Sequence, residues 1–231
     1  MMTKITDFIS KKQSKPKLNY NFEYLNDFSD VYTPTKVLDI GAFLGEFTLS
    51  CKKVWPKCEC LMVEANELFE SDLKKVGQPY LIECLGDSER IVDFYIPKDA
   101  GDISQSGSSY YKETTDYFNN DKIFSVKKNL KTLDSIIKDQ YDFIKIDTQG
   151  SELDIINGGI NTIVNANHVV LEVSLIEYNE GSPHMTEIIK KMWSLGFPNM
   201  KIVHCWGWPD GGGSKYKHLE PVQFDIIFSK N

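Results

Sequence analysis

Short apolar runs alternate along this chain with longer segments whose apolar residues recur at helical spacing. From residue 36 onwards this pattern predicts a series of strands that alternate with helices. The strands of the series are predicted at residues 37–40, 60–63, 80–84, 143–146 and 168–173. The helices are predicted at residues 47–54, 67–76, 151–157 and 185–195. A βα series of this kind is typical of an α/β fold with a parallel sheet covered by helices.

The C-terminal part of the pattern differs from this series. Two further strands are predicted at residues 201–204 and 223–228, and the chain between them leaves no room for a crossover helix. Parallel neighbours need such a crossover, whereas antiparallel strands can be joined by a simple loop. We therefore expect these two strands to pair as an antiparallel hairpin.

The ends of the chain are expected to be organised differently. Residues 1–30 are predicted to form an N-terminal segment that is partly helical, because the aromatic residues between positions 20 and 28 have helix-like spacing. This helix would cap either the domain or a cofactor pocket. Residues 31–231 are predicted to form the main domain.

An insertion interrupts the main domain at about residues 91–128, where the connection is longer than is usual between a strand and the next element. Extra strands are predicted within it at residues 91–96 and 123–126. Between them, residues 101–111 are rich in glycine and hydroxyl side chains. This loop is either a mobile connector or a lid over an active site.

The composition limits the classes of protein that need to be considered. A chain of 231 residues with 41% hydrophobic residues can build a sizeable core. The net charge of -7 argues against a surface that wraps nucleic acid. No apolar run approaches the roughly 20 residues of a membrane span, and the N-terminus lacks the apolar centre of a signal peptide. The five cysteines are expected to be reduced thiols of a cytoplasmic protein.

The segment Asp39-Ile40-Gly41-Ala42-Phe43-Leu44-Gly45 carries the most information about chemistry. It ends a buried strand with an acid, and its two glycines then allow the backbone to approach a ligand at the start of a helix. This arrangement predicts a nucleotide-type cofactor site. The dinucleotide fingerprint requires G-x-G-x-x-G, and Phe43 and Glu46 stand at two of its glycine positions, which disfavours an NAD-linked dehydrogenase. A carboxylate beside the glycines also suits the ammonium group of S-adenosylmethionine.

Several motifs resemble those of FkbM-type methyltransferases, in the same order along residues 36–229. The segment quoted above resembles the family's D-x-G-A-N-x-G opening, and Lys145-Ile146-Asp147-Thr148-Gln149-Gly150-Ser151-Glu152 is similar to K-I-D-[TV]-E-G-x-E. Shorter matches are Val63-Glu64-Ala65 to V-E-P, residues 106–109 to a serine-rich segment, Thr132-Leu133-Asp134 to T-L-D, and residues 224–228 to the closing strand. Each motif is weak alone, but five of them in sequence, followed by the closing strand, form a strong match.

The resemblance implies a class I methyltransferase fold, with a doubly wound Rossmann-like sheet of strand order 3-2-1-4-5-7-6 in which strand 7 is antiparallel. It also implies S-adenosylmethionine as the cofactor and O-methylation of sugars, polyketides or other secondary metabolites. This sequence departs from the family pattern where Phe43 replaces Asn, Ala65 replaces Pro and Gln149 replaces Glu. The last change removes one acid from the expected rim of the active site.

The predicted cofactor residues follow the carboxyl ends of the strands. Asp39 is expected either to hold the N–H groups of the glycine turn or to reach the methionine ammonium through water. Glu64 ends the second strand, where one carboxylate can accept hydrogen bonds from both ribose hydroxyls. Asp87 is placed to meet the adenine amino group. The predicted set is Asp39, Gly41, Ala42, Phe43, Gly45, Glu64, Ala65, Gly86, Asp87 and Asp147.

The predicted catalytic residues surround the fourth strand. Methyl transfer from a sulfonium depends mainly on positioning the acceptor oxygen, and a general base adds to the rate. Asp147 ends this strand, Lys145 shares its face, and Glu152 falls in the first turn of the next helix. Helix capping and a favourable helix-dipole charge are the alternative roles of the two acids. The predicted set is Asp147, Glu152, Glu172, Lys145 and His204, and no metal ligand is assigned.

The leading hypothesis is an S-adenosylmethionine-dependent O-methyltransferase that acts on a sugar, a nucleotide-sugar or a glycosylated metabolite, as in polysaccharide biosynthesis. Aromatic and hydrogen-bonding side chains around Asp147 (Lys145, Glu152, His204, Trp206, Trp208 and Tyr110) suit a sugar, which has hydroxyls at its edge and an apolar C–H face. The expected partner is therefore a small molecule rather than a nucleic acid, and a homo-oligomer is left open.

Two alternatives belong to other classes. A metal-dependent O-methyltransferase of the catechol type would use Asp147 as a ligand. It also needs an acid paired with an Asn or Asp around the fifth strand, for which Glu172 and Glu177 are imperfect substitutes. A non-catalytic domain on the same fold would serve as a scaffold or an assembly partner. The intact residues Asp39, Gly41, Gly45 and Glu64 count against this second alternative.

Overall fold

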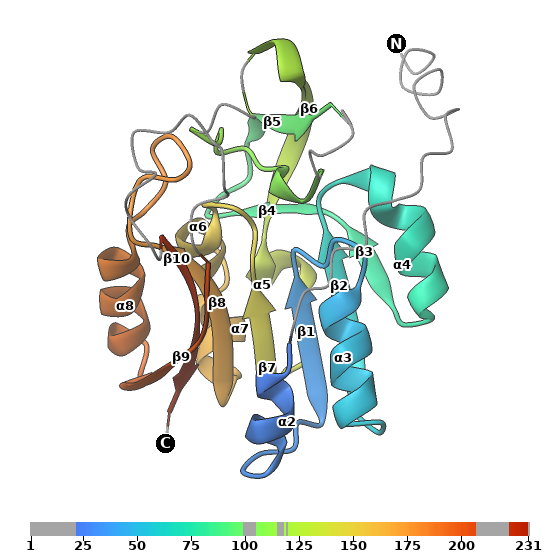
Figure 1. The fold of residues 1–231 in the computed structure, drawn as a ribbon, viewed down its shortest axis with the longest axis vertical. Helices are drawn as coiled ribbons and strands as arrows, with labels where there is room; N and C mark the ends of the chain where they lie inside the picture. Colours follow the sequence, from blue (N-terminus) through green and yellow to red (C-terminus); the bar gives the residue numbers. More distant parts are fainter. Residues whose placement is uncertain (1–21, 99–104, 115–117, 119, 207–221, 231) are drawn as a thin grey trace.

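A mostly parallel sheet forms the centre of the molecule (Figure 1). This computed structural model describes residues 22–98, 105–114, 118, 120–206 and 222–230. The described residues form a seven-stranded sheet of order β3-β2-β1-β7-β8-β10-β9. The strands are β1 Lys36–Ile40, β2 Glu59–Glu64, β3 Tyr80–Ile82, β7 Phe143–Ile146, β8 His168–Ser174, β9 Asn199–Trp206 and β10 Gln223–Ser229.

Strand direction follows the sequence pattern. Strands β3, β2, β1, β7 and β8 run parallel to their neighbours, and β10 is antiparallel to both β8 and β9. Numbered in chain order, the seven strands lie in the order 3-2-1-4-5-7-6. This is the doubly wound α/β fold expected from the sequence, with its antiparallel pair at the C-terminal edge.

Helices cover both faces of this sheet because the strand residues are apolar on both sides. They are α2 Tyr24–Ser29, α3 Glu46–Val54, α4 Glu70–Val76, α5 Leu133–Ile136, α6 Glu152–Asn157, α7 Ile160–Asn165 and α8 Met185–Ser194, with a short 3-10 helix, η1, at Glu67–Phe69. Helices α2 and α3 pack on one face, through contacts that include Leu25 and Phe47 against Phe143. Helices α5, α6, α7 and α8 pack on the opposite face.

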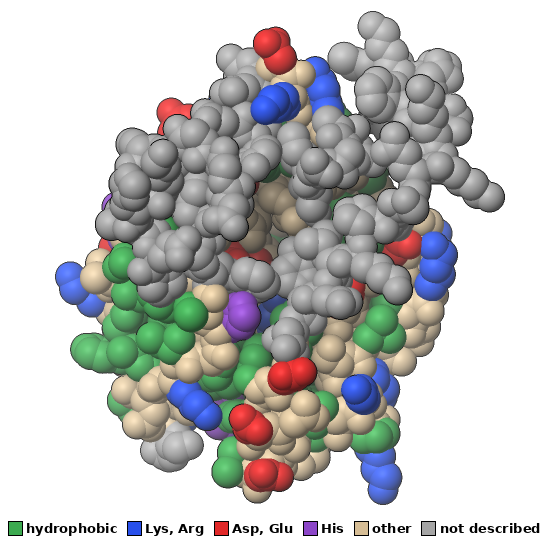
Figure 2. All heavy atoms as spheres, viewed as in Figure 1, with side chains coloured by type: hydrophobic (Ala, Val, Ile, Leu, Met, Phe, Trp, Pro, Cys, Tyr) green, Lys and Arg blue, Asp and Glu red, His purple; other side chains and the backbone are tan. Residues whose placement is uncertain are grey.

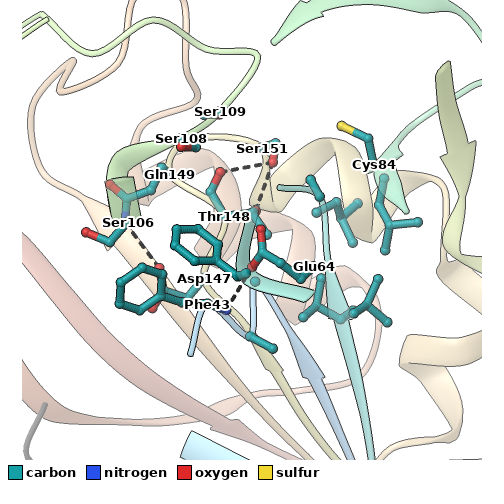
Figure 3. A pocket seen from close by; sticks show the side chains of 18 of the residues that line it. Phe43, Glu64, Cys84, Ser106, Ser108, Ser109, Asp147, Thr148, Gln149 and Ser151 are labelled. Carbon is teal, nitrogen blue, oxygen red and sulfur yellow. Dashed lines mark hydrogen bonds between the residues drawn. The ribbon is translucent and has the colours of Figure 1, made fainter. Parts of the chain in front are cut away.

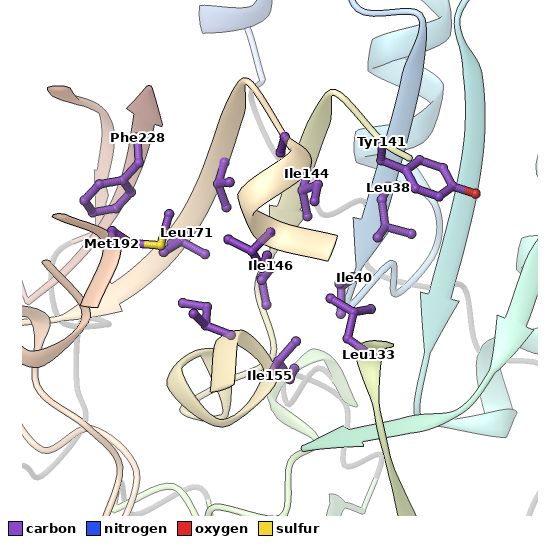
Figure 4. Close-up of a cluster of buried hydrophobic side chains, with 14 of the residues drawn as sticks. Leu38, Ile40, Leu133, Tyr141, Ile144, Ile146, Ile155, Leu171, Met192 and Phe228 are labelled. Atoms are coloured by element: carbon purple, nitrogen blue, oxygen red, sulfur yellow. The ribbon is translucent and has the colours of Figure 1, made fainter. Parts of the chain in front are cut away.

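The larger core lies on the second of these faces (Figure 4). Leu38, Ile40, Ile144 and Ile146 alternate with residues of the other face, as the period of a strand requires, and all are at most 1% exposed. Ile155 of α6 packs against them. The central strands β1 and β7 are therefore fixed by apolar contacts on both sides, which holds their carboxyl ends in register.

The insertion forms a second, three-stranded sheet of order β4-β6-β5. Its strands are β4 Cys84–Gly86, β5 Ile91–Pro97 and β6 Ile123–Thr132, and the short 3-10 helices η2 Gln105–Gly107 and η4 Asn120–Lys122 lie between β5 and β6. The two strands predicted within the insertion are thus present, and β5 pairs antiparallel with β6. In Figure 1 this sheet lies beyond the carboxyl ends of the central strands.

Three sequence predictions differ in their bounds from the structure. The strand predicted at residues 80–84 is divided, because the chain leaves the central sheet after Ile82 and Cys84–Gly86 pairs with β6 instead. The predicted helix at residues 67–76 begins as the 3-10 helix η1, capped by the side chain of Asn66. The N-terminal helix covers Tyr24–Ser29, and residues 1–21 lie outside the described part of the chain.

Several large apolar side chains are exposed near the C-terminal edge of the sheet. Trp193 of α8 is 53% exposed, and Met200 and Ile202 of β9 are 48% and 54% exposed. Figure 2 shows hydrophobic side chains gathered over this side of the molecule. In the part of the chain that the structure describes, no helix has the length and apolar character needed to cross a membrane. All five cysteines are free, and four of them are buried.

The different burial of two strand isoleucines gives a stability prediction. We expect Ile144→Ala to lower the free energy of unfolding by about 2–5 kcal/mol, because it leaves a cavity between β7 and its helices. The matched change Ile202→Ala, at a position 54% exposed, should alter it by no more than about 0.5 kcal/mol. Urea denaturation of both variants measures the difference, and equal losses would contradict the assignment of the core.

Candidate active site

A cavity lies at the carboxyl ends of β1, β2, β7 and β8, where ligands bind in open α/β sheets (Figure 3). It encloses about 890 Å³ of space that opens to solvent. One wall is formed by the turn after β1, and the insertion provides another, through residues that include Phe94, Ser106 and Ser108. The cavity thus joins the central sheet to the inserted one.

The turn after β1 depends on Gly41. Its φ is +74°, and a Cβ atom at this position would stand 1.8 Å from the carbonyl oxygen of Asp147. The N–H groups of Gly41 and Ala42 donate to the carbonyl of Val63, at 2.9 and 3.1 Å. Phe43 also has a positive φ, of 51°, which is uncommon for a residue with a side chain. The backbone is therefore bent tightly between two neighbouring strands.

Glu64, at the end of β2, fixes this turn from the side. Its Oε2 accepts a hydrogen bond from the N–H of Phe43 at 2.7 Å, and its Oε1 accepts one from the N–H of Asn66 at 2.8 Å. Burial raises the pKa of Glu64, and these N–H donors limit the rise. Each oxygen keeps a second lone pair, so the carboxylate can still accept hydrogen bonds from a ligand in the cavity.

Lys145 is the buried cation below the cavity. Its Nζ donates to the carbonyl of Gly41 at 2.8 Å and forms ion pairs with Asp39 and Asp147, at 3.5 and 3.4 Å. Burial alone would lower the pKa of Lys145, but the surrounding carboxylates, led by Asp147 and Asp39, raise it above its usual value. One charged amine therefore connects β1, β7 and the glycine turn.

Gln149 joins the two acids at the cavity's floor. Its Nε2 donates to Oε2 of Glu172 at 2.6 Å and to Oδ1 of Asp147 at 3.2 Å. The residue adopts a φ of 57°, so its backbone is held in the left-handed region. Burial and the Asp147 charge raise the pKa of Glu172 well above its ordinary value. The amide thus separates two carboxylates that would otherwise repel each other.

Glu152 holds the turn between β7 and α6. Its carboxylate accepts hydrogen bonds from the N–H of Thr148 at 2.8 Å and from the N–H of Gly150 at 3.1 Å. The side chain is 3% exposed, and burial raises its pKa to about 7 against the opposing effect of these donors. Glu152 does not line the cavity, so its contacts position the turn that carries Asp147 and Gln149.

The described part of the serine-rich segment lies over the cavity. Ser109 pairs with Tyr95 of β5 through two backbone hydrogen bonds, and Nδ2 of Asn66 donates to Oγ of Ser108 at 3.2 Å. The hydroxyls of Tyr110 and Tyr111 donate to Oδ2 of Asp154 in α6, at 2.9 and 3.0 Å. Residues 101–104 of the predicted loop lie outside the described residues.

The predicted residues divide into those that border the cavity and those that do not. The cavity is lined by Gly41, Ala42, Phe43, Glu64, Ala65, Lys145, Asp147 and Glu172. The remaining predicted residues lie outside its lining: Asp39, Gly45, Gly86, Asp87, Glu152 and His204. Of the set expected to surround a sugar, Lys145 and Tyr110 border the cavity, Trp208 lies outside the described residues, and the side chain of Trp206 is not described.

The residues away from the cavity have other contacts. The carboxylate of Asp39 is fully buried and accepts a hydrogen bond from Thr48 at 2.7 Å. Gly45 is the N-cap of α3, and a Cβ there would stand 2.5 Å from a methyl group of Val76. Asp87 forms an ion pair with Arg90 at the surface. These contacts stabilise the fold around the site.

Glu83 and Asp225 are acids that the sequence interpretation did not assign, and they lie at or near the site, as Glu46 does. Glu83 follows the last residue of β3 and lines the cavity, in the place expected for Asp87. Because β3 ends at Ile82 and not at residue 84, Glu83 stands where the sequence placed Asp87. Asp225 of β10 pairs in register with Glu172, and burial together with Asp147 raises its pKa to about 7. The sequence feature that could have indicated Asp225 is an acid within an otherwise apolar strand.

The described residues contain no group of three or more His, Cys, Asp or Glu side chains that could hold a metal ion. Asp147 and Glu172 lie on either side of the Gln149 amide, which donates to both.

Comparison with known proteins places this fold and site in a family. The family model of the methyltransferase FkbM domain matches residues 39–198, which is more than half of the chain. The chain therefore belongs to the FkbM methyltransferase domain family. No curated protein matches the sequence.

Solved structures of methyltransferases share the fold. The methyltransferase FkbM from Methylobacillus flagellatus is 14% identical with a TM-score of 0.54, over 84% of this chain and 43% of that one, so this chain spans less than half of its length. The plantazolicin methyltransferase BpumL, solved with a triazolic desmethylPZN analogue and SAH, is 13% identical with a TM-score of 0.50, over 90% of this chain and 83% of that one.

The contact between Gly41 and the Asp147 carbonyl leads to a second prediction. We expect Gly41→Ala to lower the free energy of unfolding by roughly 3 kcal/mol or more, because a positive φ and a direct clash act together. Gly77→Ala is the matched control, since Gly77 has a φ of +73° but open space around its Cβ position. It should cost about 1–2 kcal/mol. Thermal or urea unfolding compares the two, and equal losses would show that the close approach is unimportant.

The buried carboxyl of Glu152 leads to a third prediction, for the pH dependence of stability. Its pKa is raised from 4.5 to about 7 in the folded protein, so between these values the folded state binds more protons than the unfolded chain. The stabilisation that comes from the protonated Glu152 carboxyl is fully present at low pH and is lost as the pH rises through 7. At about 1.4 kcal/mol per pKa unit, the loss approaches roughly 3 kcal/mol.

Glu152→Gln does not titrate and should lack this contribution. The stability of the wild type relative to Glu152→Gln, measured by urea denaturation, is therefore expected to fall between about pH 5 and about pH 8. A constant or rising difference would mean that Glu152 is ionised in the folded protein throughout this range.

Proposed function

We propose that this protein is an S-adenosylmethionine-dependent O-methyltransferase. The observation that carries the proposal is one cavity in which the Gly41 turn, Glu64 and Asp147 meet at the carboxyl ends of three adjacent strands. Its membership of the FkbM methyltransferase domain family supports the same reaction class. S-adenosylmethionine would supply a methyl group bound to a sulfonium centre. The leaving group would be S-adenosylhomocysteine, a neutral sulfide.

The donor set of the cavity fits such a cofactor. Glu64 keeps free lone pairs for the two ribose hydroxyls, since its protein donors use one on each oxygen. Leu85 and Phe94 give apolar surface for an adenine ring, and Glu83 lies beside them as an acceptor for its amino group. The sheet order β3-β2-β1 then leaves the amino-acid end of the cofactor over the glycine turn.

Asp147 is the proposed general base. Its side chain is 29% exposed at the cavity, and its two oxygens are oriented by Lys145 and by Gln149. An acceptor hydroxyl would transfer its proton to this carboxylate as its oxygen forms the new bond to carbon. Glu152 and Lys145 act here as positioning residues, because their contacts are to the turn and to the carboxylates.

The proposed acceptor is a hydroxyl of a sugar or nucleotide-linked sugar. Support comes from the mixed lining, in which Phe22 and Phe43 offer apolar surface while Ser106 and Gln149 offer hydrogen bonds. Such a mixture suits a ring with a C–H face and hydroxyl groups at its edge. Under the same proposal, the methylated sugar would become part of a polysaccharide or a glycosylated metabolite.

Incubation with S-adenosylmethionine labelled in its methyl group and a panel of sugars and nucleotide-sugars tests the reaction. A methyl ether on a sugar hydroxyl is the expected product, whereas methyl on nitrogen, on a carboxylate or on a phenol refutes the proposal. Asp147→Asn is expected to reduce turnover by roughly 10²-fold or more with the cofactor affinity nearly unchanged. Asp93→Asn, at a surface ion pair with Lys127, is the matched control and should retain full turnover.

A further inference from the structure

Glu46 is a cavity acid that the proposed reaction has not used so far. It is the first residue of α3 and follows directly on the glycine turn. Its side chain lines the cavity together with Phe22, Phe43 and Phe47. It therefore stands over the end of β1, next to aromatic side chains.

One oxygen of this carboxylate is unsatisfied. Oε2 of Glu46 is shielded from solvent and has no hydrogen-bond partner among the described residues. A buried acceptor without a donor is costly, and an anionic one more so. Burial also raises the pKa of Glu46, as expected for a carboxyl that lacks a cation beside it. The environment thus leaves a place for a cationic donor.

The protein does not supply that donor from the described lining of the cavity. Lys145 is the one cationic side chain among the described lining residues, and it is committed to the Gly41 carbonyl, Asp39 and Asp147. Asp39, the acid that the sequence suggested for an ammonium ligand, accepts a hydrogen bond from Thr48 on Oδ2 and forms an ion pair with Lys145. Its Oδ1 also has no hydrogen-bond partner among the described residues, but the residue lies outside the lining of the cavity. Of these two acids beside the glycine turn, Glu46 is the one that borders the cavity.

We propose that Glu46 binds the α-ammonium group at the amino-acid end of S-adenosylmethionine. This inference rests on the proposed function. If adenine lies beside Glu83 and the ribose lies at Glu64, the strand order β3-β2-β1 would direct the amino-acid end of the cofactor toward the glycine turn that Glu46 follows. The ammonium group can donate three hydrogen bonds, and its positive charge would complement the negative charge of the Glu46 carboxylate.

The experiment compares three ligands by isothermal titration calorimetry. They are S-adenosylhomocysteine, its analogue in which hydrogen replaces the amino group, and 5′-methylthioadenosine, which lacks the whole amino-acid end. The wild type should prefer S-adenosylhomocysteine over the deaminated analogue by about 10-fold or more, as expected for a charge-assisted hydrogen bond. Glu46→Gln should weaken S-adenosylhomocysteine by about 10- to 100-fold and leave the other two ligands within about 2-fold.

Glu64→Gln is the matched control, because the same change at the ribose position should weaken all three ligands alike. Glu46→Asp keeps the charge and should retain part of the preference for the amino group, and the wild-type preference itself does not depend on how any variant folds. Equal binding of the deaminated analogue and S-adenosylhomocysteine to the wild type, or equal effects of Glu46→Gln on all three ligands, would overturn the inference. Failure of all three to bind the folded wild type would overturn the proposed function, and this inference with it.

Discussion

The ion pairs and the hydrogen bond of Lys145 are the interactions on which the site depends. The amine is buried between the carboxylates of Asp39 and Asp147 and also donates to the Gly41 carbonyl. Removing one partner of a buried pair leaves an uncompensated charge, at a cost of about 3–5 kcal/mol. These groups come from β1, from the end of β7 and from the glycine turn after β1. The floor of the cavity is therefore fixed by charge as well as by packing.

This single cation has more acids around it than it can neutralise. Glu172 and Asp225 face each other on β8 and β10, and the pKa of both is raised by burial and by Asp147. Gln149 lowers the repulsion by donating to Glu172 and Asp147 at once. The region can therefore hold a proton at a carboxyl near neutral pH, which is the property that a proton-accepting site needs.

The sequence could predict the parts of this arrangement that depend on local pattern. Strand periodicity placed Lys145 and Asp147 on one face, and the motif after β2 placed Glu64 at the cavity. It could not predict Glu83, because the third strand ends two residues early when Cys84 pairs with β6. Nor could it predict the contact of Gln149 with Glu172, since two strands must first pair in register.

The acids of the site differ in where their hydrogen-bond donors come from, and under the proposed function this difference separates structural from ligand-binding positions. Glu152 receives its donors from the protein, Asp39 has Thr48 as a donor and Lys145 as an ion-pair partner, and both acids lie outside the cavity lining. Glu64 and Asp147 have protein donors but keep lone pairs toward the cavity. Glu46 lines the cavity with one oxygen that has no donor among the described residues. Under the proposed function, the donor that this oxygen lacks would come from the ligand.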